Sequence, residues 1–206
     1  SCSLVGSEMC IRDRAKADLN TPNLEAVKKG AANLVRHIDN MKNGFGLPVV
    51  VAINAFPTDT KAELDLVEAK CRELGVNVRL SEVWAKGGEG GLALAEEVVR
   101  LCDEPNHFQF VYDVNDSIED KLNAIATKVY HADGVVIAAS AKKQLKQLTE
   151  LGFDKLPICM AKTQFSFSDD ASKLGAPRGF KITVRDLKVN AGAGFLVAKT
   201  GDIMTM

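Results

Sequence analysis

The sequence lacks the features that mark membrane proteins and nucleic-acid-binding proteins. Its 206 residues carry 26 Lys and Arg against 27 Asp and Glu, a formal net charge of -1, so no basic surplus attracts nucleic acid. No apolar run approaches the roughly 20 residues that a membrane span needs. Because 46% of the residues are hydrophobic, the chain can form one sizeable core or two small ones. We therefore expect a globular protein that binds neither nucleic acid nor membrane.

Cysteine is also sparse, with five residues in the chain. Outside the first ten residues, Cys71, Cys102 and Cys159 are far apart and embedded in apolar periodic segments. This pattern is typical of reduced core thiols in a cytoplasmic protein and not of a disulfide framework. The three histidines have no partner at metal or catalytic-dyad spacing, so we predict no metal site.

The beginning of the chain has neither a helical nor a strand period. Leu4 to Asp13 read LVGSEMCIRD, which is also what one reading frame of a common transposase sequencing adaptor encodes. We therefore expect residues 1–14 to be a processing scar that is foreign to the protein. The alternative is a genuine disordered N-terminus.

The next residues predict a helix followed by a buried strand. Thr21 resembles an N-cap with Pro22 at the first helical position, and apolar residues three and four apart extend one amphipathic helix to Gly44. The uninterrupted apolar run Val49–Ile53 is typical of a strand buried on both faces, as in parallel sheets.

Later segments continue the alternation of helices and strands. Thr60 and Glu63 have capping-box spacing at the start of a helix that ends at Gly75. The alternation predicts an α/β fold, a mainly parallel sheet with flanking helices. Further helices are expected to begin near Gly91, Ser117 and Ser140, and further strands at VNVRL, VYDV, GVVIAA, LPICMA and FKITVRDLKV.

One soft boundary divides the predicted elements. The string GFDKLP precedes a more strand-rich end of the chain. We therefore expect an α/β segment over residues 15–152 that carries the ligand-site loops, and a strand-rich segment over residues 153–206.

Two aromatic residues follow neighbouring strands. Phe56 and Pro57 come after VVVAIN, and Trp84 comes after VNVRLSEV. In open α/β sheets, ligands bind beyond the carboxyl ends of the strands. The two rings could therefore clamp a flat heteroaromatic ligand by offset stacking. The alternative is that each ring packs locally and has no ligand.

Two polar or glycine-rich loops are further candidates. Lys86, Gly87 and Gly88 lead into a helix whose N-terminal amides could meet an anion, although the pattern is neither GxGxxG nor GxxxxGK[ST]. Lys162 and Thr163 lie in the polar loop AKTQFSFSDD. Each loop could bind a ligand, or could only connect and cap elements.

Six strings in order carry a resemblance to a known family: FGLPVVVAINAFPTDT, SEVWAKGGEGG, LPICMAKTQFSFSDD, GFKITVRDL, NAGAGF and GDIMTM. Together they resemble formate–tetrahydrofolate ligase, also called 10-formyltetrahydrofolate synthetase, of the bacterial single-function type. The likeness extends from Ala17 to Met206. It implies an ATP-dependent ligase, with Mg, that activates formate as formyl phosphate and transfers the formyl group to tetrahydrofolate. It also implies a homo-oligomer.

The resemblance implies roles for individual residues. Phe56 and Trp84 match the residues that hold the pterin ring, and Pro57 and Leu80 match positions lining the same folate pocket. The glycine turn and the Lys162 loop lie near the active cleft in the family, without assigned contacts. This chain departs from the family at Ala55, where bacterial members often have a larger polar residue, and at His131, where glycine is usual. Glycine tolerates positive φ more readily than histidine does.

A larger departure is the absence of GxxxxGK[ST] from the sequence. The family has a P-loop NTPase-related fold whose phosphate-binding loop lies upstream, and the resemblance also continues past MTM. We therefore expect a fragment that lacks the N-terminal nucleotide-binding portion and the catalytic residues there, and that is inactive alone. The alternative is a non-catalytic folate- or nucleotide-binding module of the same fold.

Overall fold

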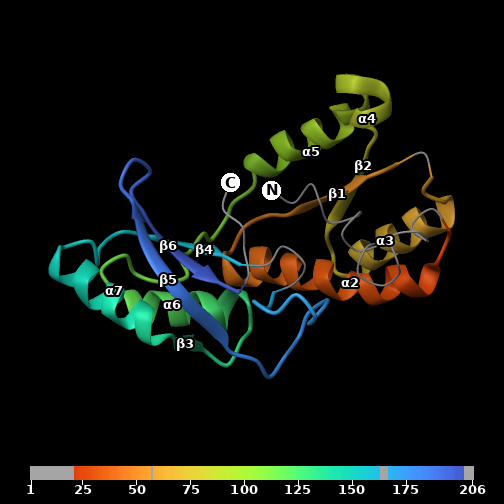
Figure 1. Ribbon diagram of the computed structural model, residues 1–206. Helices are drawn as coiled ribbons and strands as arrows, with labels where there is room; N and C mark the ends of the chain where they lie inside the picture. The colour runs from red at the N-terminus through yellow and green to blue at the C-terminus, as the bar shows by residue number, and fades with distance from the viewer. Residues whose placement is uncertain (1–20, 57, 163–166, 202–206) are drawn as a thin grey trace. The chain divides into compact units, whose positions relative to one another are not determined.

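The computed structural model describes residues 21–56, 58–162 and 167–201. The chain divides into two compact units, Ser1–Phe108 and Gln109–Met206, and each is described by itself (Figure 1). Both units combine parallel strands with helices, which confirms the predicted α/β class.

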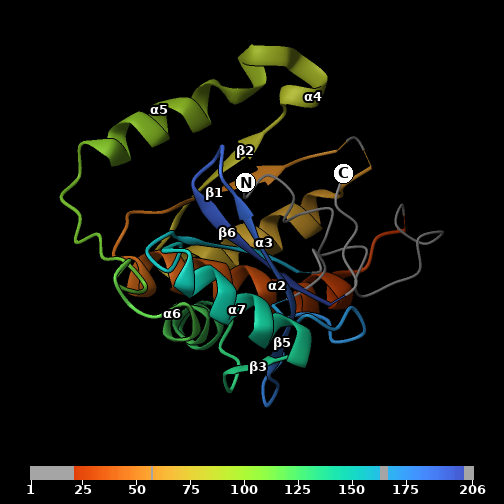
Figure 2. The ribbon, with the colours of Figure 1, turned by 60° about the vertical axis from the view of Figure 1, so that its left-hand side comes forward.

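The first unit is built on two parallel strands, β1 (Val50–Asn54) and β2 (Asn77–Ser81), in register from Val50↔Asn77 to Asn54↔Ser81. Helices α2 (Leu24–Asp39) and α3 (Lys61–Glu73) pack with the strand pair around a core that includes Leu34, Val51 and Cys71. The short α4 (Val83–Lys86) and α5 (Leu92–Cys102) lie on the other side of the strand pair (Figures 1 and 2).

Strand β1 is less buried than we predicted. Val51 is buried, while the other four residues of the strand are only half-buried. The prediction of burial on both faces is wrong because β1 has a single described partner strand in a two-stranded sheet. The helices therefore bury one face more completely than the other.

The first helix begins two residues later than we predicted. Asn23 is the N-cap, and its side-chain oxygen accepts a hydrogen bond from the backbone N–H of Ala26 at 3.0 Å. Thr21 is therefore not the cap, because an Asn at the helix entrance fills that role at least as well. The helix continues through a π-helical turn, Asn40–Gly44, so its predicted end is confirmed.

The capping box of α3 is confirmed. The Thr60 hydroxyl accepts from the Glu63 N–H at 3.4 Å, and the Glu63 carboxylate accepts from the Thr60 N–H at 3.2 Å. The same carboxylate also accepts from the Asn23 N–H at 2.9 Å, so one side chain serves the entrances of two helices. At the other end, Gly75 has a φ of 62°, the left-handed conformation that ends many helices.

The second unit contains a four-stranded sheet in the order β3-β5-β6-β4. Strands β3 and β5 pair in parallel, β4 and β6 pair in parallel, and β5 and β6 form an antiparallel hairpin. The strands are β3 (Val135–Ile137), β4 (Ile158–Ala161), β5 (Ile182–Asn190) and β6 (Phe195–Thr200), and the helices are α6 (Ile118–Ala124), its π-helical extension (Ile125–Val129) and α7 (Ala139–Glu150).

One predicted strand is absent from the described second unit, and one unpredicted strand is present. The string VYDV, residues 111–114, is irregular. The carbonyl of Val111 accepts from the Lys128 ammonium at 2.8 Å, and the Tyr112 hydroxyl accepts from the Ile158 N–H at 2.9 Å. These hydrogen bonds involve the side chains of Lys128 and Tyr112, whereas a strand would pair through backbone groups on both sides. Strand β6 was not predicted; within NAGAGF, residues 191–194 form the turn that joins it to β5.

A buried lysine connects α6 to two distant loops. The side chain of Lys121 is fully buried, and its ammonium donates to the carbonyls of Val114, Asp154 and Leu156 at 3.1, 2.5 and 2.9 Å. These bonds use all three N–H donors of the ammonium. Lys121 therefore fixes the GFDKLP segment to the helix.

The compact units divide at residues 108 and 109, not at the boundary expected between residues 152 and 153. One apolar core joins Leu122, Ile137, Ile158 and Leu196, which lie on both sides of position 152. The division differs because GFDKLP is tied into this core by Lys121. The separate roles expected for the segments 15–152 and 153–206 stay a prediction.

The cysteines differ from the prediction in their burial. Cys71 is buried, and this burial, with the nearby charge of Glu68, raises the pKa of its thiol to about 11. Cys102 and Cys159 are exposed, so the prediction that all three are core thiols is wrong for these two. The three are free thiols. Among the described helices, none is both long and apolar enough to cross a membrane.

Candidate functional site

The structure places the two predicted ring-binding residues beyond the ends of paired strands. Phe56 follows β1 by two residues, and Trp84 lies in α4, three residues after β2. Because β1 and β2 are parallel neighbours, their carboxyl ends meet at one edge of the sheet. Phe56 is 36% exposed and Trp84 is 69% exposed. Both rings therefore present apolar surface at this edge.

The backbone around Phe56 is fixed by local hydrogen bonds. The N–H of Ala55 donates to the Ser81 carbonyl at 3.1 Å, which extends the pairing of β1 and β2 by one residue. The N–H of Phe56 donates to the Asp59 carboxylate at 2.8 Å, and the Asp59 N–H returns a bond to the Phe56 carbonyl at 3.0 Å. The turn is thus closed before α3 begins. Pro57 lies outside the described residues.

The turn that carries Trp84 requires glycine at two positions. The Glu82 N–H donates to the Gly90 carbonyl at 3.0 Å, which closes the turn. At Gly90, a Cβ would lie 2.5 Å from the backbone of Glu82. Gly87 has φ 61° and ψ -146°, a conformation that is essentially restricted to glycine. Two of the glycines in this cluster are therefore needed for the shape of the turn.

The same geometry favours connection over anion binding in this turn. The Lys86 ammonium pairs with the Glu82 carboxylate at 2.6 Å. Residues Gly87–Gly91 form a 3-10 helix directly before α5, and the N–H of Leu92 donates to the carbonyl of Glu89. The Lys86 ammonium and the Leu92 N–H, which we expected to be available to an anion, thus have partners within the turn. Gly88 has no neighbour within 4 Å of a built Cβ.

Leu80 lies one position before the end of β2 and pairs in register with Ile53. It is 41% exposed. In contrast, Val78, two residues earlier on β2, and its partner Val51 on β1 pack into the core. Leu80 therefore adds apolar surface near the strand ends that precede Phe56 and Trp84.

The second predicted loop belongs to the other unit. Lys162 directly follows β4, and its ammonium lies 5.3 Å from the centroid of the Tyr130 ring, a cation–π distance. Burial raises the pKa of Tyr130 to about 12. Thr163 lies outside the described residues. The structure therefore gives Lys162 a local partner.

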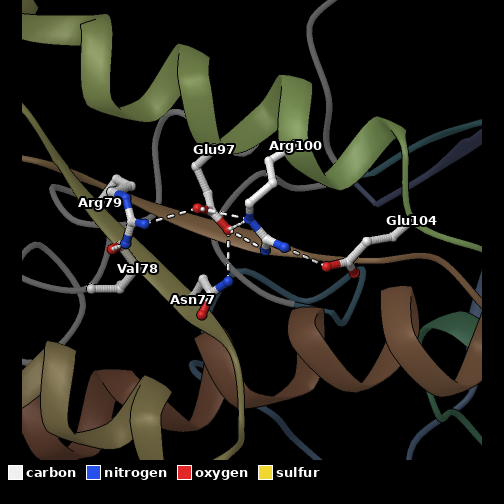
Figure 3. Close-up of polar contacts among 6 residues, drawn as sticks. All are labelled: Asn77, Val78, Arg79, Glu97, Arg100 and Glu104. Carbon is white, nitrogen blue, oxygen red and sulfur yellow. Dashed lines mark hydrogen bonds and ion pairs between the residues drawn. The ribbon is translucent and has the colours of Figure 1, made fainter.

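Sequence reasoning missed a buried carboxylate on α5, the helix that follows the Trp84 turn. Glu97 of α5 has a side chain only 4% exposed, and it accepts hydrogen bonds from Asn77 and Arg79 of β2 at 2.6 and 2.8 Å (Figure 3). Arg100 of the same helix adds a third partner at 2.7 Å and also contacts Glu104. Hydrogen bonds from Arg100, then from Asn77, and the charges of both arginines lower the pKa of Glu97 to about 2.

A weak signal for this network exists in the sequence. Asn77 and Arg79 alternate on β2, so they share one face of a strand, and Glu97 and Arg100 are three apart on a helix. Neither pattern shows that the strand and the helix meet. Only the fold brings Glu97 to β2.

The first unit is thus a parallel α/β unit with exposed aromatic side chains beyond adjacent strand ends, the edge at which open α/β sheets bind ligands. The family model described as formate–tetrahydrofolate ligase matches residues 6–206. The chain therefore belongs to the formate–tetrahydrofolate ligase family, whose substrates include ATP and tetrahydrofolate. The match begins inside residues 1–14, and the expectation that this segment is foreign stays a prediction.

The family's use of ATP raises the question of where a metal ion would bind. Within the described residues, no group of three or more His, Cys, Asp or Glu side chains could hold one. Mg²⁺ that is bound together with ATP does not require such a cluster, because one or two carboxylates and the substrate phosphates can hold the ion.

Proposed function

We propose that this chain supplies the tetrahydrofolate-binding side of a ligase that forms 10-formyltetrahydrofolate from formate through formyl phosphate. The observation that carries the proposal is the position of Phe56 and Trp84, which are both exposed beyond the carboxyl ends of hydrogen-bonded parallel strands. The turn of each residue is closed by backbone hydrogen bonds. The rings thus extend from hydrogen-bonded turns, which favours the preorganisation that a binding site requires.

The chemistry of the pterin ring matches these side chains. An aromatic pair in offset or edge-to-face contact contributes about 0.5–1.5 kcal/mol beyond the burial of its area. The pterin would bury the surface of Trp84 and Phe56, with Leu80 and Pro57 as apolar walls. Apolar burial adds roughly 25 cal/mol per Å². The proposed role of these four residues is therefore binding and orientation, not proton or phosphoryl transfer.

The phosphate chemistry is proposed to depend on other residues. The sequence contains no GxxxxGK[ST], the loop type that surrounds phosphates with backbone N–H groups. We therefore expect the 206-residue chain to bind tetrahydrofolate without forming product from formate and ATP. A P-loop-related parent fold, a homo-oligomer and a cytoplasmic location are further parts of this proposal.

The test is a tetrahydrofolate titration of the chain under reducing conditions, following the fluorescence of its sole tryptophan, Trp84. We expect saturable quenching that weakens about tenfold in Phe56→Ala, since stacking and burial are both lost. The matched control is Phe110→Ala, which removes a phenylalanine that is 81% exposed in the other unit. Equal weakening in both variants, or no quenching by tetrahydrofolate in the folded chain, would contradict the proposal.

A second candidate function is a non-catalytic folate- or nucleotide-binding module, which the absence of GxxxxGK[ST] favours. An ATP titration of the same chain tests the nucleotide-binding form of this second candidate. Binding of ATP in competition with tetrahydrofolate would favour a nucleotide-binding module. Tetrahydrofolate binding that ATP leaves unchanged would exclude a nucleotide site shared with the folate.

A further inference from the structure

Helix α5 buries a charged side chain instead of an apolar stripe. Glu97 is its only buried residue. Leu92 and Val99 are 54% and 65% exposed, and Leu94 and Leu101, on the same helix face as Glu97, are only half-buried. Most helices at a sheet are held there by a continuous apolar face. The attachment of α5 to β2 therefore depends to an unusual degree on Glu97.

The Glu97 carboxylate joins the helix to the strand. It accepts from Asn77 at 2.6 Å and from Arg79 at 2.8 Å, both on β2, and the Arg79 guanidinium is held in turn by the Val78 carbonyl at 2.9 Å (Figure 3). Arg100 provides a further charge on the helix side. Hydrogen bonds to ionised groups are roughly twice as strong as neutral ones, so this contact fixes the position of the helix along the strand.

The same helix determines one end of the Trp84 turn. The turn leaves β2 after Ser81 and enters α5 at Leu92, and its closing bond joins the Glu82 N–H to the Gly90 carbonyl at 3.0 Å. Trp84 lies between these two ends. A shift of α5 along β2 would therefore move the Gly90 side of the turn relative to the Glu82 side.

We propose that Glu97 is a positioning residue of the folate site: by joining α5 to Asn77 and Arg79, it holds the Trp84 turn at the end of β2. Glu97 is not assigned any contact with the ligand. This role rests on the proposed function, because the ligand it serves is tetrahydrofolate. It adds to that function a residue that acts through Trp84.

The test compares two variants of the 206-residue chain. Glu97→Gln keeps the size of the side chain and removes its charge. The matched control is Glu104→Gln on the chain after the same helix, because Glu104 pairs with Arg100 but is 43% exposed and has no described bond to β2. For Glu97→Gln we expect tetrahydrofolate binding to weaken about tenfold and Trp84 fluorescence anisotropy to fall without ligand. Glu104→Gln should keep both values close to those of the unchanged chain.

A second substitution keeps the proposal testable if Glu97→Gln does not fold. Arg79→Gln removes one partner that is 40% exposed and leaves Asn77 and Arg100 on the carboxylate. We expect a smaller weakening in the same direction, about threefold, with circular dichroism unchanged.

The outcomes separate positioning from general stability. A Glu97→Gln chain with a lower unfolding midpoint but unchanged affinity and anisotropy would overturn the proposal, because a merely structural role moves only the midpoint. If the unchanged chain does not bind tetrahydrofolate, the proposed function fails. The anisotropy then decides the positioning role alone: a value below that of Glu104→Gln supports it, and equal values overturn it.

Discussion

Among the described residues, each unit buries one charged side chain to attach a helix, and the two units do so with different partners. In the first unit, Glu97 is neutralised by Arg79 and Arg100. In the second, the three partners of Lys121 are neutral backbone carbonyls. A carboxylate between arginines stays ionised, whereas a lysine among carbonyls has its hydrogen bonds satisfied without a charged partner at hydrogen-bond distance. The difference shows that hydrogen-bond satisfaction and charge compensation are separate requirements of a buried ion.

The largest expected effect comes from removing the lysine. In Lys121→Met, the carbonyls of Val114, Asp154 and Leu156 lose their shared donor. Because unsatisfied buried acceptors are costly, we expect a loss of about 3–5 kcal/mol in the free energy of unfolding, measured by denaturant titration. The control Lys128→Met removes a single bond to the Val111 carbonyl and should cost about 1 kcal/mol or less. Equal effects would show that the three-carbonyl contact is not special.

The next largest effect is expected in the first unit, from a substitution that changes the shape of the Trp84 turn and leaves the residues of the Glu97 contact in place. In Gly90→Ala, the new Cβ would lie 2.5 Å from the Glu82 backbone, so the closing bond of the turn must break or shift. We expect a loss of about 2 kcal/mol and weaker tetrahydrofolate binding. Gly88→Ala is the matched control, because a Cβ there meets nothing within 4 Å. A Gly90→Ala chain as stable as Gly88→Ala would contradict the described turn.

Both buried charges should make the protein more stable as the pH rises, one in an acidic window and the other in an alkaline window. The pKa of Glu97 is lowered from 4.5 to about 2, so its stabilisation is complete above pH 4.5 and is lost as the pH falls through this window. Burial lowers the pKa of Lys121 from 10.5, so the folded state releases its proton first and stability gains as the pH rises toward 10.5. Unfolding midpoints of Glu97→Gln and Lys121→Met against pH test this. If the unfolding midpoints of both variants changed with pH as steeply as that of the unchanged chain, the assignment of these pH responses to Glu97 and Lys121 would be contradicted.

The smallest effect concerns local strain in the second unit, away from its buried lysine. His131 has a φ of 54°, and it is the one non-glycine residue with positive φ in the described chain. The resemblance to the family implies glycine at this position. We expect His131→Gly to raise the free energy of unfolding by about 0.5–1 kcal/mol. His107→Gly serves as the control, and a loss of stability at His131 equal to that at His107 would show that no strain is relieved.

The elements that were predicted correctly carry their signals locally. Thr60, Glu63 and Gly75 mark both ends of α3 within the sequence itself, and the structure reproduces each mark. The positions of Phe56 and Trp84 after strands could be read in the same way, because strand ends follow from hydrophobic runs.

The features that were missed depend on contacts between distant residues. The string VYDV has strand-like composition, but lysines from α6 and its extension take the carbonyls of Val111 and Val114. Glu97 reads as one of many helix-surface charges until β2 brings Asn77 and Arg79 to it. Such contacts leave no periodic pattern in the sequence, and tertiary structure alone reveals them.

The central claim is that the aromatic residues beyond β1 and β2 bind tetrahydrofolate, and calorimetric titration of Trp84→Ala tests it most directly. This measurement does not need the tryptophan as a probe, so the unchanged chain, Trp84→Ala and Phe110→Ala are compared on one scale. We expect Trp84→Ala to weaken binding at least about tenfold, with the fold intact by circular dichroism and Phe110→Ala unchanged. Equal dissociation constants for all three chains would contradict the account.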